Sequence, residues 1–283
     1  MEVEFLGSGG AITIPVPGCQ CAICVEARAK GIPYARSGPA TFVHGPDVLI
    51  DTPEEIKEQL NRSQVTHIAA ATYSHWHPDH TMGRRVWEMN YDWRHWPPTP
   101  QTTPIYLPQQ VAEDFEHYHG IWQHLTYLEN SGLVALQRVP DGKCFSVGTT
   151  RITPVALADP SVYAFIFEDE GRRLFVAQDE LVGWHPPGDL GHLDLAVLPL
   201  GMMEFHPLSG RRLTPAGHPV LEDEATFRQT LEIVRELHVD RVVMMHIEEP
   251  DQVSYDDLEL TARQLANDGY NITFAYDGLI CPV

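Results

Sequence analysis

The stretch His75-Trp76-His77-Pro78-Asp79-His80 places three imidazoles and one carboxylate within six consecutive positions. It follows a short apolar run, residues 67–73, that is typical of a buried strand. In α/β proteins, functional groups collect beyond the carboxyl ends of such strands. Imidazole and carboxylate suit zinc, iron or manganese, so the stretch predicts a metal site. A single histidine would more often be a packing or surface residue, but four ligand-type side chains in six positions favour a site.

The spacing within this stretch predicts two ions rather than one. His75 and His77 are alternate residues, so both imidazoles can point toward one ion. Asp79 and His80 leave the same turn and can serve a second ion nearby. We therefore expect two divalent ions, with Asp79 taking part directly in the chemistry.

The rest of the chain is expected to add strands in two β-rich halves and a few helices. Short runs of apolar and β-branched residues predict the strands, and apolar positions at helical spacing predict a helix over residues 222–237. No low-complexity linker separates these segments, so we expect one domain of residues 1–283. The predicted strands cover residues 2–10, 41–44, 48–51, 67–73, 133–139, 151–157, 162–168, 172–177, 194–199, 241–245 and 271–276, and further helices cover residues 54–60 and 255–267.

The histidine-rich stretch resembles the HxHxDH motif of the metallo-β-lactamase superfamily. This resemblance implies an α/β (α+β) fold, a four-layer αββα sandwich. It also implies two further ligands at the ends of later strands. Asp179, in Val176-Ala-Gln-Asp179, corresponds to the carboxylate that bridges the two ions, and His246, after Val242-Val-Met-Met245, to the last histidine.

Within the superfamily, three features resemble the phosphoribosyl cyclic phosphodiesterase (PhnP) branch. They are Leu6-Gly-Ser-Gly-Gly10, the spacing Cys19-x-Cys21-x-x-Cys24, and Tyr276-Asp-Gly278 near the end. The resemblance implies hydrolysis of a small cyclic or exposed phosphodiester by a metal-bound hydroxide, and a possible homodimer. PqqB-like proteins of quinone-cofactor biosynthesis share the cysteine cluster, so the cluster selects a branch rather than a reaction.

The three clustered cysteines predict a structural zinc site in a loop at about residues 17–26. The chain has five cysteines, and this odd number does not suggest a secreted disulfide framework. Soft thiolate ligands suit tetrahedral zinc, although three free cysteines remain an alternative. In PhnP-like proteins a histidine three positions after the last metal histidine completes this site. Here Glu249 occupies that position, and its carboxylate is expected to be the fourth ligand, although a site of three cysteines and a glutamate is less usual.

A second departure from the superfamily concerns its third histidine. That histidine should follow the strand at residues 151–157, but none occurs between His124 and His185. Asp159 stands in that place and could hold the same ion, which would favour a harder metal such as manganese or iron. Alternatively, Asp159-Pro160 only makes a turn, and the site has decayed to one ion.

Two further residues receive roles with equally open alternatives. Asp51, at the end of a predicted strand, is expected to orient a ligand histidine rather than to bind metal. His218, in Pro215-Ala-Gly-His218, resembles a histidine that the branch places near the scissile group, where it could protonate a leaving oxygen. It could equally be a surface loop histidine.

Charge and hydropathy limit the partners. The net charge of −20 opposes general binding to nucleic acids or anionic membranes, but a small anionic substrate remains possible because metal ions can outweigh the global field locally. With no apolar run of about 18 residues and no leader pattern, we expect a cytoplasmic protein without membrane attachment. Two other functions stay open: a PqqB-like accessory metal-binding protein without hydrolase activity, and a di-iron enzyme that handles oxygen.

Overall fold

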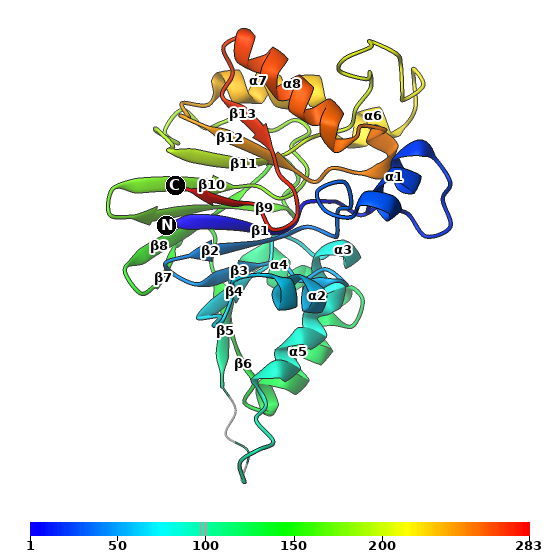
Figure 1. Cartoon of the computed structure of the whole chain (residues 1–283). Coiled ribbons are helices and arrows are strands. Elements are labelled where there is room, and N and C mark those ends of the chain that lie inside the picture. Colours follow the sequence, from blue (N-terminus) through cyan, green and yellow to red (C-terminus); the bar gives the residue numbers. More distant parts are fainter. Residues whose placement is uncertain (97, 99–100) are drawn as a thin grey trace.

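The computed structural model describes every residue except 97, 99 and 100. Two seven-stranded sheets pack face to face, and helices cover the outer face of each (Figure 1). This confirms the four-layer αββα sandwich that the superfamily resemblance implied.

The first sheet has the strand order β14-β1-β2-β3-β4-β5-β6 and the second β13-β12-β11-β10-β9-β8-β7. The strands of the first sheet are β1 (Glu2–Gly7), β2 (Ala40–His44), β3 (Val48–Ile50), β4 (Ala70–Thr72), β5 (Thr103–Pro108), β6 (Val134–Val139) and β14 (Ile280–Pro282). Those of the second are β7 (Phe145–Val147), β8 (Thr150–Ala156), β9 (Tyr163–Asp169), β10 (Arg172–Val176), β11 (Leu195–Pro199), β12 (Val242–Met245) and β13 (Ile272–Phe274). The helices are α1 (Ala22–Lys30), α2 (Ile56–Arg62), α3 (Pro78–Thr81), η1 (Met82–Asn90), α4 (Gln109–His117), α5 (Ile121–Asn130), α6 (Val220–Asp223), α7 (Phe227–Glu236), η2 (Glu249–Asp251) and α8 (Tyr255–Asn267).

Each sheet joins a parallel part to an antiparallel part. Strands β3 to β6 are parallel in the first sheet, and β10 to β13 are parallel in the second. Parallel neighbours end at the same edge of a sheet, where ligand-binding loops gather. The segments that follow β3, β4, β10 and β12 carry Asp51, the histidine-rich stretch, Asp179 and His246. The topology therefore brings residues far apart in sequence to one edge of the sandwich.

The two sheets are held together by a continuous apolar layer. Phe5 and Phe42 from the first sheet and Phe165 and Phe167 from the second are at most 1% exposed and belong to one buried cluster. A second cluster packs β11 and β12 against α7 and α8, where Ile233 and other apolar residues face the sheet. Burial of this apolar surface is the main stabilising contribution to the fold.

Local signals explain where the later helices begin. Thr226 caps α7 by accepting a hydrogen bond from the Gln229 amide, and Ser254 caps α8 in the same way from Asp257. Helix α8 has the bounds that the sequence predicted, whereas the predicted helix over residues 222–237 divides at Glu224 into α6 and α7. In the described part of the chain, no helix is both long and apolar enough to span a bilayer.

Candidate metal centre

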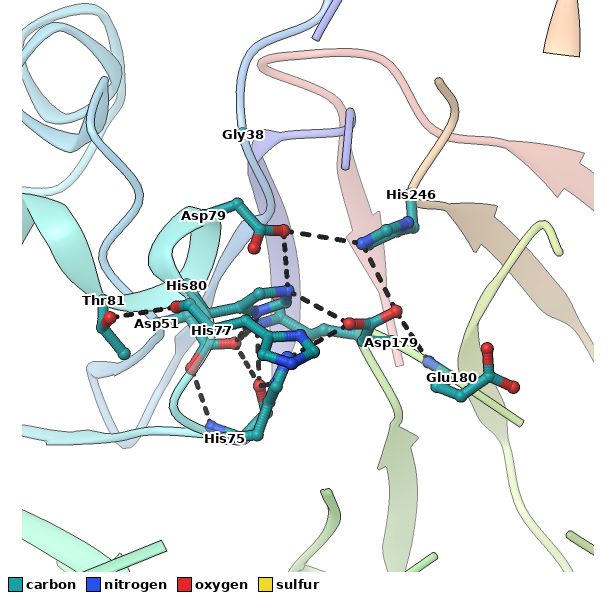
Figure 2. Close-up of polar contacts among 12 residues, drawn as sticks. Gly38, Asp51, His75, His77, Asp79, His80, Thr81, Asp179, Glu180 and His246 are labelled. Atoms are coloured by element: carbon teal, nitrogen blue, oxygen red, sulfur yellow. Dashed lines mark hydrogen bonds and ion pairs between the residues drawn. The ribbon is translucent and has the colours of Figure 1, made fainter. Parts of the chain in front are cut away.

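Two groups of potential metal ligands meet between the edges of the two sheets (Figure 2). The first consists of His75, His77 and Asp179, and the second of Asp79, His80 and His246. Within each group the candidate ligand atoms lie within 4.8 Å of one another.

Asp179 connects the two groups. One of its carboxylate oxygens, Oδ2, lies 3.2 Å from His75 Nε2 and 3.5 Å from His80 Nε2. The other, Oδ1, lies 3.4 Å from His246 Nε2. One carboxylate thus faces histidines of both groups, which is the arrangement expected of a ligand shared by two ions.

Local backbone geometry aims these side chains. Asp179 lies three residues after the end of β10, and His246 directly follows β12 in a left-handed conformation with φ of 57°. Residues other than glycine rarely adopt this conformation, and strained backbone of this kind is common at functional sites. Pro78 occupies the first turn of α3, so the chain turns into a helix between His77 and His80.

The residues present fit divalent cations. The Nε2 atoms of His75, His80 and His246 are buried and form no hydrogen bond in the structure. A buried polar atom without a partner is costly, and a bound cation would satisfy these lone pairs. Imidazole nitrogen and carboxylate oxygen together suit zinc, manganese or iron.

The charges of the second group are strongly coupled. Burial alone would raise the pKa of Asp79, but the neighbouring His80 lowers it to about 2. Burial would lower the pKa of His80, but Asp79 and Asp51 raise it well above the usual value. The pKa of His246 is likewise raised, against its burial, mainly by Asp179. Without a cation, protons on these imidazoles balance the carboxylates, and a cation can replace them.

Asp51 orients the ligands without belonging to either group. Its side chain is fully buried, and its Oδ2 accepts hydrogen bonds from His80 Nδ1 at 2.7 Å and from the Ser74 hydroxyl at 2.6 Å. Gln178 donates to the same oxygen at 2.5 Å. The Nδ1 contact leaves His80 Nε2 free to face a cation, as the sequence predicted for a ligand-orienting carboxylate.

The cysteine cluster forms a third group. The sulfurs of Cys19, Cys21 and Cys24 and a carboxylate oxygen of Glu249 all lie within 4.8 Å of one another, with Cys21 Sγ 3.0 Å from Glu249 Oε1. Burial and the hydrogen bond with Glu249 raise the pKa of the Cys21 thiol to about 12. A thiophilic cation would displace the thiol protons and bind the sulfurs and the carboxylate, so the donor set fits a zinc-type ion.

Two predicted site residues lie outside these groups. Asp159 is exposed, and its Oδ1 accepts hydrogen bonds from the backbone amide and the hydroxyl of Ser161, both at 2.8 Å. The structure therefore shows Asp159 in the turn that was the alternative, and not beside His75 and His77. His218 is also exposed, and its Nδ1 accepts a hydrogen bond from the Val220 amide, so it has the surroundings of a surface loop histidine.

Two features next to the site were not predicted from the sequence. Trp76 stacks on Tyr118 with ring centroids 4.0 Å apart, and it lies edge-on to His77 at 4.5 Å. The only sequence feature that points to this aromatic pair is the position of Trp76 between two candidate ligand histidines. We call Trp76 and Tyr118 the aromatic platform. In addition, a small cavity beside Asp179 and His246 is lined by the carboxylates Glu180, Glu224, Glu248 and Asp251, whose sequence positions follow no motif.

The fold and the site define the class as an αββα sandwich with a candidate binuclear metal centre. The family model described as beta-lactamase superfamily domain matches residues 46–247, and the chain belongs to this family. The comparison with curated proteins gave no match.

Solved structures share the fold over nearly their whole length. A diphosphatase from the PhnP family has a TM-score of 0.71 and 23% identity, covering 100% of this chain and 97% of that one. Zinc-bound PqqB from Methylobacterium extorquens has a TM-score of 0.67 and 16% identity, and the short form of human tRNase Z (ELAC1) has 0.64 and 16%, each covering 100% of both chains. At these identities the likeness concerns the fold.

Proposed function

We propose that this protein is a metal-dependent hydrolase, most specifically a phosphodiesterase acting on a small cyclic or exposed phosphodiester. The observation that carries the proposal is the convergence of two three-residue ligand groups on the shared carboxylate of Asp179. His75, His77 and Asp179 would hold one ion, and Asp79, His80 and His246 the other. Bound there, two divalent ions supply Lewis acidity and an activated water, which serve the cleavage of phosphate esters.

The protein's own residues then have distinct tasks. Asp179 would hold the two ligand groups together, because its Oδ2 faces His75 of the first group and His80 of the second, and its Oδ1 faces His246 of the second. Asp79, with a pKa of about 2, stays ionised at neutral pH, so it serves as an anionic ligand better than as a proton acceptor. The stacked rings of Trp76 and Tyr118 beside His77 offer a surface on which a planar ring of the substrate could stack.

The choice of a phosphodiester is supported by the sequence features shared with the PhnP branch and by the likeness to a PhnP-family diphosphatase. The same metal platform also suits esters, thioesters and lactones, because polarising an oxygen and activating water serve any such electrophile. The substrate test therefore compares these classes directly.

The test uses purified protein loaded with zinc or manganese. We expect hydrolysis of bis(p-nitrophenyl) phosphate and of a five-membered cyclic phosphodiester to exceed that of a thioester and a lactone. His77→Ala and Asp179→Ala should reduce turnover at least ~1,000-fold while circular dichroism stays unchanged, since removing parts of a catalytic unit has effects of this order. His67→Ala, at an exposed histidine bonded to Gln101, is the matched control and should keep wild-type turnover. Wild-type turnover in Asp179→Ala would disprove the proposal.

One observation favours a second candidate, a PqqB-like accessory protein that binds metal without hydrolysis. Asp159 does not join His75 and His77, so the first group has three ligands and no substitute for the missing histidine. An ion there would be held less firmly than in a complete set. Binding of one ion, without turnover of any tested ester, would support this candidate. Oxygen uptake by an iron-loaded protein would instead indicate a di-iron enzyme.

A further inference from the structure

One short segment carries both the last histidine of the metal centre and Glu249 of the cysteine group. Residues 246–252 begin with His246, and Glu249, three positions later, faces Cys19 and Cys21. Gln252 at the end of the segment donates hydrogen bonds to Glu249, at both its backbone carbonyl and its carboxylate, each at 2.9 Å. Any interaction that fixes the position of Glu249 therefore also restricts His246, because only three peptide bonds separate the two residues.

The chain that leads into the cysteine loop also binds this segment directly. The Ile247 amide donates to the Ser8 carbonyl at 3.0 Å, and the Glu249 amide donates to the Ile12 carbonyl at 3.1 Å. The Ile12 amide donates to Glu248 Oε1 at 2.8 Å. Residues 8–12 and 247–249 are thus joined by hydrogen bonds on both sides of Glu248.

Gly10 brings the same chain against the ring of His246. A Cβ atom at position 10 would lie 2.3 Å from His246 Cε1 and 2.6 Å from Glu248 Oε1. No side chain fits at position 10, so the backbone of residues 8–12 packs directly against the His246 ring. If the cysteine loop moved, residues 8–12 would move with it and would no longer restrict the position of the His246 ring.

Most other hydrogen bonds of the cysteine loop are local. The amides of Cys21 and Cys24 donate to the sulfurs of Cys19 and Cys21 at 3.4 Å, and Arg28 donates to the carbonyls of Val16 and Cys19. All four of these contacts lie within residues 16–28, which comprise the loop and most of α1. The contacts of Cys19 and Cys21 with Glu249 connect the loop to the segment that carries His246. A bound cation would replace these contacts by coordination bonds to the sulfurs and the carboxylate.

We infer that a thiophilic cation held by Cys19, Cys21, Cys24 and Glu249 positions His246, so that this ion and the ion at Asp79, His80 and His246 strengthen each other's binding. The inference rests on the proposed function only in requiring an ion at the second group. Glu249 is then a positioning residue for the metal centre, and loss or oxidation of the thiolates weakens the second ion without touching any of its ligands. By linkage the coupling is reciprocal.

The experiment titrates metal-free protein with Co²⁺, because cobalt bound to thiolates gives near-ultraviolet charge-transfer bands that imidazole and carboxylate ligands do not give. A His77→Ala background disables the first group, so a competing chelator then reports the affinity of the second. In this background we expect Cys21→Ser to lose the thiolate bands and to weaken the second site about tenfold, the lower end of the range for residues that support ligands. Cys144→Ser, at an exposed cysteine between β6 and β7, is the matched control and should match its parent.

Two further variants separate coupling from damage to the fold. Glu249→His keeps four ligands and should retain the thiolate bands and the affinity of the second site. His246→Ala disables the second site, so it should weaken cobalt binding to the cysteine group. The loss of affinity should be the same factor by which Cys21→Ser weakens cobalt binding to the second site, because coupling is reciprocal. Melting of each metal-free variant at the wild-type temperature would show that folding is unchanged.

Unchanged affinity of the second site in Cys21→Ser, with the thiolate bands gone, would overturn the inference. Equal weakening in Cys144→Ser would overturn it as well, because the effect would then not depend on the cysteine group. If wild-type protein binds both ions of the metal centre but hydrolyses no ester, the proposed function fails while the coupling stands. If only the thiolate bands appear and the histidine groups bind nothing, both fail.

Discussion

At the scale of single residues, the metal centre depends on buried charges that compensate each other. His80 lies between Asp51, which accepts from its Nδ1, and Asp79, whose carboxylate lies 3.2 Å from its Nε2. His246 faces Asp179 and, at 3.9 Å, Asp79. An isolated buried charge would be costly, so each carboxylate needs a proton or a cation nearby.

These charges predict how metal binding depends on pH. Because nearby carboxylates raise the pKa values of His80 and His246, protons compete more strongly with a cation for these imidazoles than for free ones. Lowering the pH from 8 to 6 should therefore weaken binding, roughly tenfold per pH unit for each proton displaced. Competition with a chromogenic chelator at several pH values measures this, and calorimetry in buffers of different ionisation enthalpy counts the protons. An affinity independent of pH would contradict the assignment.

A second prediction concerns Asp159, for which sequence and structure suggest different effects. If Asp159 were a ligand, Asp159→Ala would remove or weaken one ion. In the structure its carboxylate instead accepts two hydrogen bonds from Ser161, so we expect metal content per chain to stay unchanged. Elemental analysis of the variant decides between the two, with Asp179→Ala as the positive control. Loss of one ion from Asp159→Ala would show that the loop rearranges around the metal.

At the scale of elements, the ends of parallel strands were predictable and the loops between them were not. Asp179 and His246 follow runs of apolar residues whose strand character is plain in the sequence, and the ends of parallel strands share an edge. Asp159 and His218 lie in loops whose side chains are oriented by local hydrogen bonds, and no periodicity encodes those. The platform of Trp76 and Tyr118 depends on a contact between elements far apart in sequence, which a single sequence does not reveal.

The chain after the metal motif contains both buried and exposed tryptophans, which allows a test of packing in this region. Trp87 is fully buried, and its Nε1 donates to the Tyr73 hydroxyl at 3.0 Å, whereas Trp93 is 74% exposed. Trp87→Ala should lower the free energy of unfolding by about 3–5 kcal/mol, as for other buried aromatic residues. Trp93→Ala, the matched control, should change it by less than ~0.5 kcal/mol. Urea denaturation measures both, and equal effects would mean that Trp93 is also packed in solution.

At the scale of the whole molecule, the metal centre joins the two sheets. The histidine-rich stretch follows β4 of the first sheet, whereas Asp179 and His246 follow β10 and β12 of the second. Each ligand group takes residues from both sheets, and in Figure 2 they approach from opposite sides. Ions bound there would therefore add a cross-link to the apolar layer that already holds the sheets together.

This arrangement predicts that metal removal destabilises the fold at the junction of the sheets. Ions that bind only the folded chain stabilise it by mass action, by about 4 kcal/mol for one ion at a free concentration 1,000 times its Kd. A strong chelator should lower the melting temperature of the wild-type protein, and hydrogen exchange should quicken first in the segments after β4, β10 and β12. In Asp179→Ala the chelator should cause a much smaller drop, because the shared ligand is missing. The part of the drop that persists belongs to the cysteine group, and it should vanish when Cys21→Ser is added. An equal drop in wild type and Asp179→Ala would mean that the ions do not connect the sheets.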